Sequence, residues 1–200
     1  MTPQTAAEPS CPGYVNVDRR RLARLVEAAG SSPSGYLDRV SVPEEVTVRP
    51  EADARVVIQA ALPESAMGPT TTRAVVWQDA AGAWWYWRRT FDYSWVRQSA
   101  PNADGTITWE PERYPPSTGS LPAPAVEQVE FLLSHPCRTS DPAAWPRELP
   151  LRSGRTRECP LDAASYVMRI QWREGAVENI SAPCENETMT FQLIKTVLGR

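Results

Sequence analysis

The stretch "TRAVVWQDAAGAWWYWRRT", residues 72–90, decides the fold that we expect. Its two ends, residues 72–78 and 84–90, are rich in β-branched and aromatic residues, and Gly82 lies in the segment between them. A three-residue loop with glycine in the left-handed conformation is a common connection between antiparallel strands. The stretch therefore predicts a β-hairpin.

The loop length also predicts which side chains of the hairpin share a face, because side chains alternate along a strand. One face is expected to carry Val75, Trp77, Trp85 and Trp87, and the other to carry Val76, Gln78, Trp84 and Tyr86. Large rings thus occupy both faces. Arg88 and Arg89 follow them, and arginine can stack on rings or bind carboxylates as a fork.

The aromatic strand has two interpretations. Helices and Pro-rich loops could cover both faces of the sheet, so that the rings form a hydrophobic core. Alternatively, one face meets solvent and forms an apolar patch of the kind that marks an interaction site. For this second interpretation the candidate ligand-binding residues are Trp84, Trp85, Tyr86, Trp87, Arg88 and Arg89.

The composition of the 200 residues, 42% hydrophobic and 22% charged, is typical of a folded protein. A net charge of −3 provides no basic field for nucleic acid. No apolar stretch approaches the roughly 18 residues of a membrane span.

Residues 1–13 are Pro- and Ala-rich, as expected of a flexible leader left after removal of a signal peptide. Residues 14–200 are expected to form a single domain, in which 111–124 and 138–158 are the candidate sub-boundaries.

The four cysteines, Cys11, Cys137, Cys159 and Cys184, indicate the compartment. They show no C-x-x-C spacing, and the chain has one histidine, so we expect no metal site and no cofactor. Separated cysteines fit two disulfides in an oxidising compartment, with three possible connectivities. We favour Cys159–Cys184, which brackets a predicted hairpin, and Cys11–Cys137. The protein is therefore expected to be periplasmic or secreted; the alternative is a cytoplasmic protein with four reduced thiols.

The remaining elements complete an α+β fold. Helices are predicted over 19–29, over a segment with Val126, Val129, Leu132 and Leu133 that ends before Pro136, and from an N-cap at Asn186 to Gly199. Strands are predicted at 46–49, 55–60 and 106–110, and a second hairpin joins "YVMRIQW" (166–172) to "AVENIS" (176–181). Residues 111–124 and 138–158 are expected to be irregular. We thus expect an antiparallel sheet of hairpins with about three helices on one face, stabilised by disulfides.

Two catalytic arrangements deserve comparison with a binding role. His135 lies two residues before Cys137, but both flank Pro136, and Cys137 has a competing disulfide role, which argues against a thiol–imidazole pair. Glycoside cleavage needs two carboxylates at a defined separation. The acidic residues in or beside the aromatic strands are Asp79, Asp92, Glu110 and Glu112. Motifs for phosphate loops or a serine elbow do not occur.

The expected function follows from these observations. The aromatic strand offers contact area at low cost in side-chain entropy, as recognition surfaces tend to do. We therefore expect an extracytoplasmic, non-catalytic binding or interaction protein whose partner is a protein or glycan of the cell envelope, with no nucleic acid partner. The alternative is a hydrolase that acts on glycans, with carboxylates beside the aromatic strand.

Overall fold

The computed structural model describes residues 21, 24, 37, 40–42, 44, 46–62, 70–98, 103–105, 109–139, 141, 145, 148–150, 154, 156–159, 165–182, 184–185 and 188–200. The expected leader, residues 1–13, lies outside them. Arg21 and Arg24 belong to the helix predicted over 19–29, and both are helical. The rest of that predicted helix lies outside the described residues.

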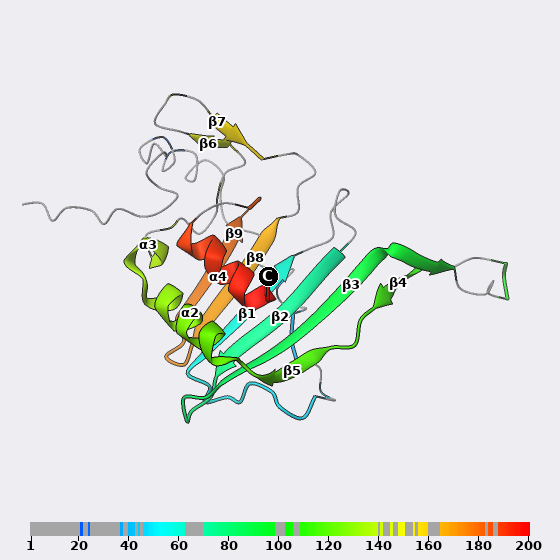
Figure 1. Cartoon of the computed structure of the whole chain (residues 1–200), viewed down its shortest axis with the longest axis horizontal. Helices are drawn as coiled ribbons and strands as arrows, with labels where there is room; N and C mark the ends of the chain where they lie inside the picture. The colour runs from blue at the N-terminus through cyan, green and yellow to red at the C-terminus, as the bar shows by residue number, and fades with distance from the viewer. Residues whose placement is uncertain are drawn as a thin grey trace, which may run out of the picture.

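An antiparallel sheet forms the centre of the molecule (Figure 1). Its strands are β1 (Val56–Leu62), β2 (Thr70–Gln78), β3 (Trp84–Gln98), β4 (Trp109–Arg113), β5 (Ser117–Ser120), β8 (Tyr166–Trp172) and β9 (Val177–Ala182). Their order is β4-β3-β2-β1-β8-β9, and β5 also pairs with β3. A separate two-stranded sheet contains β6 (Glu148–Pro150) and β7 (Thr156–Glu158). The predicted antiparallel α+β fold is thus confirmed.

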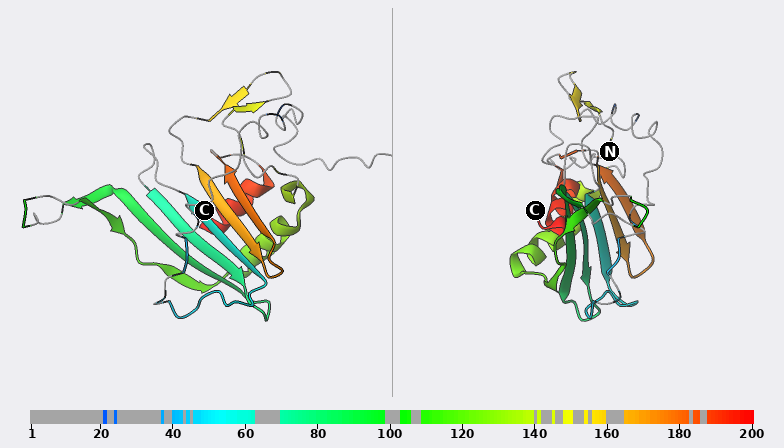
Figure 2. Two further views of the ribbon diagram at one scale, coloured as in Figure 1. Left: turned by 180° about the vertical axis from the view of Figure 1, so that it is seen from behind. Right: turned by 90° about the vertical axis from the view of Figure 1, so that its right-hand side faces the viewer.

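Helices α2 (Ala123–Ser134), α3 (Pro136–Thr139) and α4 (Met189–Leu198) lie on one side of the sheet, as the edge-on view of Figure 2 shows. Helix α4 packs on β1, β2 and β8, and α2 packs on α4. The hydroxyl of Thr188 accepts a hydrogen bond from the Phe191 N–H and so caps α4, whereas Gly199 ends the helix with φ 76°. The predicted end at Gly199 is confirmed, and the predicted N-cap at Asn186 is wrong by two residues.

The aromatic hairpin has the predicted register. Gln78 lies opposite Trp84, so that the loop begins after the last pair of β2 and β3. The Asp79 N–H donates to the Ala83 carbonyl at 2.9 Å, and the Gly82 N–H donates to the Asp79 carbonyl at 3.1 Å. Gly82 has φ 93°, a left-handed conformation that residues with a side chain rarely adopt. The three-residue loop therefore forms as predicted.

Buried side chains form a core on each side of the sheet. The core on the helix side includes Val56, Ile58, Ala74, Val76, Trp84, Met168, Ile170, Phe191 and Ile194. The core on the opposite side, which we call the far face, consists of Leu37, Val40, Ala61, Val75, Trp77, Trp87 and Val167, with Val42, Val46 and Val48 packed against it. The predicted division of the hairpin into two faces is confirmed.

Three segments differ from the sequence-based expectation. Residues 46–49 form no strand; Val46 and Val48 pack over the far face instead of pairing along an edge. The segment 111–124, expected to be irregular, contains the end of β4, all of β5 and the start of α2. Pro111 is tolerated because β4 is an edge strand, where a missing N–H need not break a ladder. The segment 138–158 likewise contains the end of α3 and all of β6 and β7.

The cysteines support the predicted disulfides. Cys159 and Cys184 are bonded, with their Cα atoms 5.9 Å apart, so this predicted pair is confirmed. Cys137 is also disulfide-bonded. Its predicted partner, Cys11, lies outside the described residues, and that pairing stays a prediction. In the described part of the chain, no helix is both long enough and apolar enough to cross a bilayer.

Candidate functional site

The far face is built from rows of side chains that cross β8, β1, β2 and β3. Strand register and side-chain alternation place three rows on this face: Gln171, Val57, Trp77 and Trp85; then Arg169, Gln59, Val75 and Trp87; then Val167, Ala61, Arg73 and Arg89. The first row is mostly apolar and aromatic. The third row ends in two arginines. The hairpin thus gives one face two chemically different regions.

A cavity of about 960 Å³ lies over the first two rows. Its floor consists of Val57, Gln59, Val75, Trp77 and Trp85, and residues 41–42 and 47–52 together with the hairpin turn form its other walls. Trp77 is only 1% exposed, so it supports the floor from below. Trp85 is partly exposed and offers its ring to the cavity.

Asp79 fixes the orientation of Trp85. The Trp85 Nε1–H donates to Asp79 Oδ2 at 2.9 Å, and the Ala83 N–H donates to Asp79 Oδ1 at 2.8 Å. The hydrogen bond from Trp85, followed by that from Ala83, lowers the pKa of Asp79 below its ordinary value. Asp79 is therefore an ionised acceptor that holds the indole ring, and it is poorly suited to donate a proton.

Charged and polar groups complete the cavity. Arg49 and Glu51 are exposed and line its outer wall, and Gln59 donates a hydrogen bond from its amide nitrogen to the Val40 carbonyl. A ligand that enters the cavity therefore meets an aromatic floor and a polar rim. This combination is typical of sites for small molecules.

Trp84 and Tyr86, two of the candidate ligand-binding residues, face the helices. Trp84 is 6% exposed, and its Nε1–H donates to Glu130 Oε1 on α2 at 2.9 Å. Tyr86 packs against the edge of the helix-side core, and its hydroxyl lies 3.0 Å from the hydroxyl of Ser117. Both side chains connect the hairpin to neighbouring elements on that side.

Arg88 also faces the helices and caps the C-terminal end of α4. Its Nε donates to the Val197 carbonyl at 2.9 Å, and its Nη2 donates to the Thr196 carbonyl at 3.1 Å. The guanidinium carbon lies 4.7 Å from the centre of the Tyr86 ring. Burial lowers the pKa of Arg88. Among the six candidate residues, Trp85, Trp87 and Arg89 thus share the far face, and the other three serve the opposite side.

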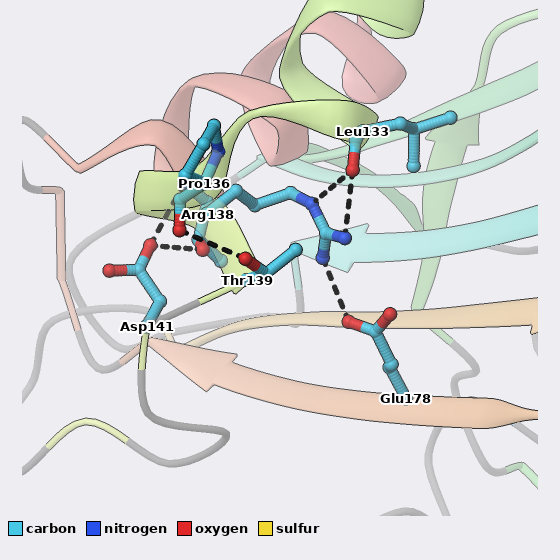
Figure 3. A network of polar contacts seen from close by, with 7 residues as sticks. Leu133, Pro136, Arg138, Thr139, Asp141 and Glu178 are labelled. Carbon is cyan, nitrogen blue, oxygen red and sulfur yellow. Dashed lines mark hydrogen bonds and ion pairs between the residues drawn. The ribbon is translucent and has the colours of Figure 1, made fainter. Parts of the chain in front are cut away.

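A second, smaller cavity of about 280 Å³ lies between α3, β9 and the start of α4. Figure 3 shows the polar network beside it: Arg138 donates to Glu178 at 2.8 Å and to the Leu133 carbonyl at 3.0 and 2.9 Å. Arg138 is 3% exposed, so the arginine side chain of the Arg138–Glu178 ion pair is buried, whereas the Glu178 side chain is exposed.

Asp141 lies in the same network. Its Oδ2 accepts hydrogen bonds from the Thr190 N–H, at 3.1 Å, and from the Thr190 hydroxyl, at the N-terminal end of α4. Burial raises the pKa of Asp141 from 3.8 to about 7, against the opposing effect of the two Thr190 hydrogen bonds. The carboxyl group therefore exchanges a proton near neutral pH.

Of the catalytic candidates whose side chains the structure describes, Asp79 lines the large cavity and His135 does not. His135 Nδ1 accepts a hydrogen bond from the Cys137 N–H, and its ring makes an edge contact with Phe131. Asp92 lies opposite Glu112 in the β3–β4 register, and their side chains lie outside the described part of the structure. No group of three or more His, Cys, Asp or Glu residues that could hold a metal ion occurs among the described residues.

Sequence reasoning missed the cavity wall and Asp141. The valines at 46 and 48 predict a strand over 46–49, because alternating valines indicate a strand and a covering loop equally well. Asp141 belongs to no periodic pattern, and its relation to Thr190 depends on the tertiary fold. Comparisons of the chain with protein-family models, with curated proteins and with solved structures find no match.

Proposed function

We propose that the protein is an extracytoplasmic, non-catalytic binding protein that takes a small ligand, or the end of a glycan or peptide of the cell envelope, in the large far-face cavity. The observation that carries this proposal is the partly exposed Trp85 ring, held by Asp79 at the floor of a cavity of about 960 Å³. Cavities that bind small molecules commonly measure about 300–1,000 Å³.

The shape of the site favours a small ligand over a flat protein surface. The cavity lies between the sheet and walls formed by residues 41–42 and 47–52, so a ligand there contacts more than one side of the cavity. An aromatic ring fixed by a hydrogen bond loses little side-chain entropy on binding, which favours affinity. Gln59, Arg49 and Glu51 supply polar groups that can select among ligands.

The chemistry of the cavity favours binding over hydrolysis. Glycoside hydrolysis requires one carboxylic acid with a raised pKa beside a second carboxylate. The pKa of Asp79 is lowered instead, because Trp85 and Ala83 donate hydrogen bonds to its charged form. The glycan hydrolase therefore stays the alternative, and the facing positions of Asp92 and Glu112 in the register are the observation in its favour.

The extracytoplasmic location is supported by the disulfides. Cys159 and Cys184 are bonded, and Cys137 is also disulfide-bonded. Disulfides persist mainly in the periplasm and outside the cell. A protein with a removed signal peptide fits this chemistry.

The test is a ligand screen with a matched pair of variants. The purified protein is screened by thermal shift against fragments of envelope glycans and short peptides, and hits are measured by calorimetry. Trp85→Ala is expected to weaken binding about tenfold or more, since burial of a large ring against a ligand contributes more than 1.4 kcal/mol. Phe131→Ala removes an aromatic side chain that is 56% exposed on α2 and should leave the affinity unchanged.

Two outcomes would contradict the proposal. The first is equal affinity of the Trp85→Ala variant and the unmodified protein for every hit, with both proteins folded. The second is release of a shortened glycan during the measurement, which would establish the hydrolase instead.

A further inference from the structure

Strand β9 forms one edge of the sheet, and its register shows which of its backbone groups point outward. The Trp172 N–H donates to the Ala176 carbonyl at the β8–β9 turn, so these two residues form a hydrogen-bonded pair. Hydrogen-bonded and non-hydrogen-bonded pairs alternate along an antiparallel ladder. The register therefore places Val177, Asn179 and Ser181 in non-hydrogen-bonded pairs, and their backbone N–H and C=O groups point away from β8.

The chain itself uses one of these outward groups. The Trp145 N–H donates to the Ser181 carbonyl at 3.0 Å, so another segment already pairs with this end of the edge. The outward groups of Val177 and Asn179 have no hydrogen-bond partner within the described part of the chain. Residues 177–179, which we call the open edge, span about 7 Å at about 3.4 Å per residue.

The smaller cavity lies along the open edge. Four consecutive residues of β9, 177–180, line this cavity. Because alternate residues of a strand face opposite sides of a sheet, this lining places the cavity beside the strand rather than over one face. Its volume of about 280 Å³ corresponds to about nine water-sized groups of about 30 Å³ each. The cavity therefore has room for about two small amino-acid residues.

The charged groups that line the smaller cavity favour a cation. The guanidinium group of Arg138 is directed toward Glu178 and the Leu133 carbonyl rather than toward Asp141, as Figure 3 shows. Asp141 has no ion-pair partner among the described residues, and its Oδ1 accepts no hydrogen bond there. Two carboxylates and one guanidinium group leave the cavity with a net negative charge when Asp141 is ionised.

The two edge strands of the sheet differ in how they are protected. Proteins commonly protect an edge with proline, with lysine or with a bulge. The strand at the opposite edge, β4, contains Pro111, and its pairing with β3 includes a register shift. Strand β9, with the sequence "VENISA", has neither proline nor lysine, and its pairing with β8 runs without a shift. The open edge of β9 is therefore suited to an added strand.

We propose that the open edge of β9 and the smaller cavity bind a short extended peptide that carries a positive charge. The peptide pairs with the outward backbone groups of Val177 and Asn179 as an added strand, and its charged group contacts Asp141. Main-chain hydrogen bonds give such strand addition its affinity, and adjoining cavities give it specificity. A second copy of the chain fits less well, because an edge of about 7 Å offers far less than the roughly 1,200 Å² of a stable interface.

The peptide site stands independently of the proposed function, because the two cavities share no lining residue. The test is an NMR titration of isotope-labelled protein at about pH 7.5 with three peptides. Trialanine amide has a charged amino end, N-acetyl-alanyl-lysyl-alanine amide has a charged side chain, and N-acetyl-trialanine amide is neutral. The amide protons of Val177 and Asn179 are expected to shift downfield saturably with at least one charged peptide, since each gains a hydrogen bond. The neutral peptide should bind about tenfold or more weakly.

The comparison of the two charged peptides identifies the source of the charge, an amino end or a lysine side chain. Asp141→Asn should weaken the binding of the charged peptides about tenfold. The matched control, Asp53→Asn, makes the same change at an exposed position outside the smaller cavity and should leave the affinity unchanged. Asn179→Pro removes an outward N–H and leaves the ladder to β8 intact. It should bind more weakly than Asn179→Ala, which lacks the same side chain but keeps the N–H.

Asp141→Asn decides the outcome if Asn179→Pro does not fold. Absence of saturable shifts with both charged peptides would overturn the proposal, as would equal affinity for neutral and charged peptides. Unchanged affinity in Asp141→Asn, or equal binding by the two folded Asn179 variants, would do the same. Dimerisation that shifts the Val177 and Asn179 signals as the protein concentration rises would also overturn it, because a second copy would then occupy the open edge. Since the signals report on β9, failure of the large cavity as a ligand site does not affect this test.

Discussion

Replacement of Asp141 by Asn should change how the stability of the protein depends on pH. The pKa of Asp141 is about 7 in the folded protein and 3.8 for the ordinary group. Because the folded pKa is the higher one, the stability that this carboxyl contributes is fully present below pH 4. It is lost as the pH rises from about 4 through 7, since the folded state must then hold a buried charge. Asparagine resembles the protonated acid, and its side-chain oxygen can still accept from Thr190.

The magnitude follows from the displacement of the pKa. A change from 3.8 to about 7 is roughly three pH units, and at 1.36 kcal/mol per unit it corresponds to about 4 kcal/mol. Asp141 is partly exposed, and Arg138 and Glu178 line the same cavity, so solvent and neighbouring charge reduce this value to about 2–4 kcal/mol. We therefore expect Asp141→Asn to be more stable than the unmodified protein by this amount at pH 8, and by little at pH 4.

The assay is equilibrium unfolding in urea between pH 4 and pH 8, with the disulfides intact. The difference between variant and unmodified protein isolates Asp141, because all other groups titrate in both. Thr139→Val serves as a control, since it alters an uncharged side chain at the same cavity and should give the same difference at every pH. A difference for Asp141→Asn that does not change with pH would refute the reasoning, as would loss of stability at pH 8.

Two further predictions concern the helix end and the disulfide. Gly199→Ala should lower the free energy of unfolding by about 1–3 kcal/mol in a thermal unfolding assay, because φ is +76° and a Cβ would lie 2.8 Å from Arg88 Nη1. The control is Gly105→Ala, with φ +80° and no atom within 4 Å of the added carbon, which should lower the free energy of unfolding less. Replacement of both Cys159 and Cys184 by Ser opens a link with a sequence separation of 25 and should cost about 3 kcal/mol, measured by urea unfolding; an unchanged midpoint would contradict this.

The hairpin could be predicted because its signals are local. The loop at Gly82 and the alternation on either side fix the register, and the register fixes which rings share a face. The same holds for α4, where the stripe of Leu193, Ile194 and Val197 and the terminal Gly199 predicted both the buried side and the end of the helix.

The rest of the site depends on contacts between distant segments. Val46 and Val48 alternate as strand residues do, but their side chains pack on the far face of the sheet, a contact that the alternation alone does not reveal. Ser117–Ser120 has no strand composition, and it pairs with β3 because that long strand leaves backbone groups available next to Trp85–Arg88. Arg88 gave no local sign that it would cap a helix more than a hundred residues later in the chain.

The pairing of β1 with β8 has a consequence for folding kinetics. Val56 lies opposite Trp172 in the middle of the sheet, so this contact closes a loop of more than a hundred residues. Contacts of such long range form slowly, because the entropy of loop closure is lost before the contact forms. Until β8 arrives, one edge of β1, with the sequence "VVIQAAL", has no neighbour. An unpaired apolar edge is a template for association between chains. Nascent protein is therefore most prone to aggregate in this interval.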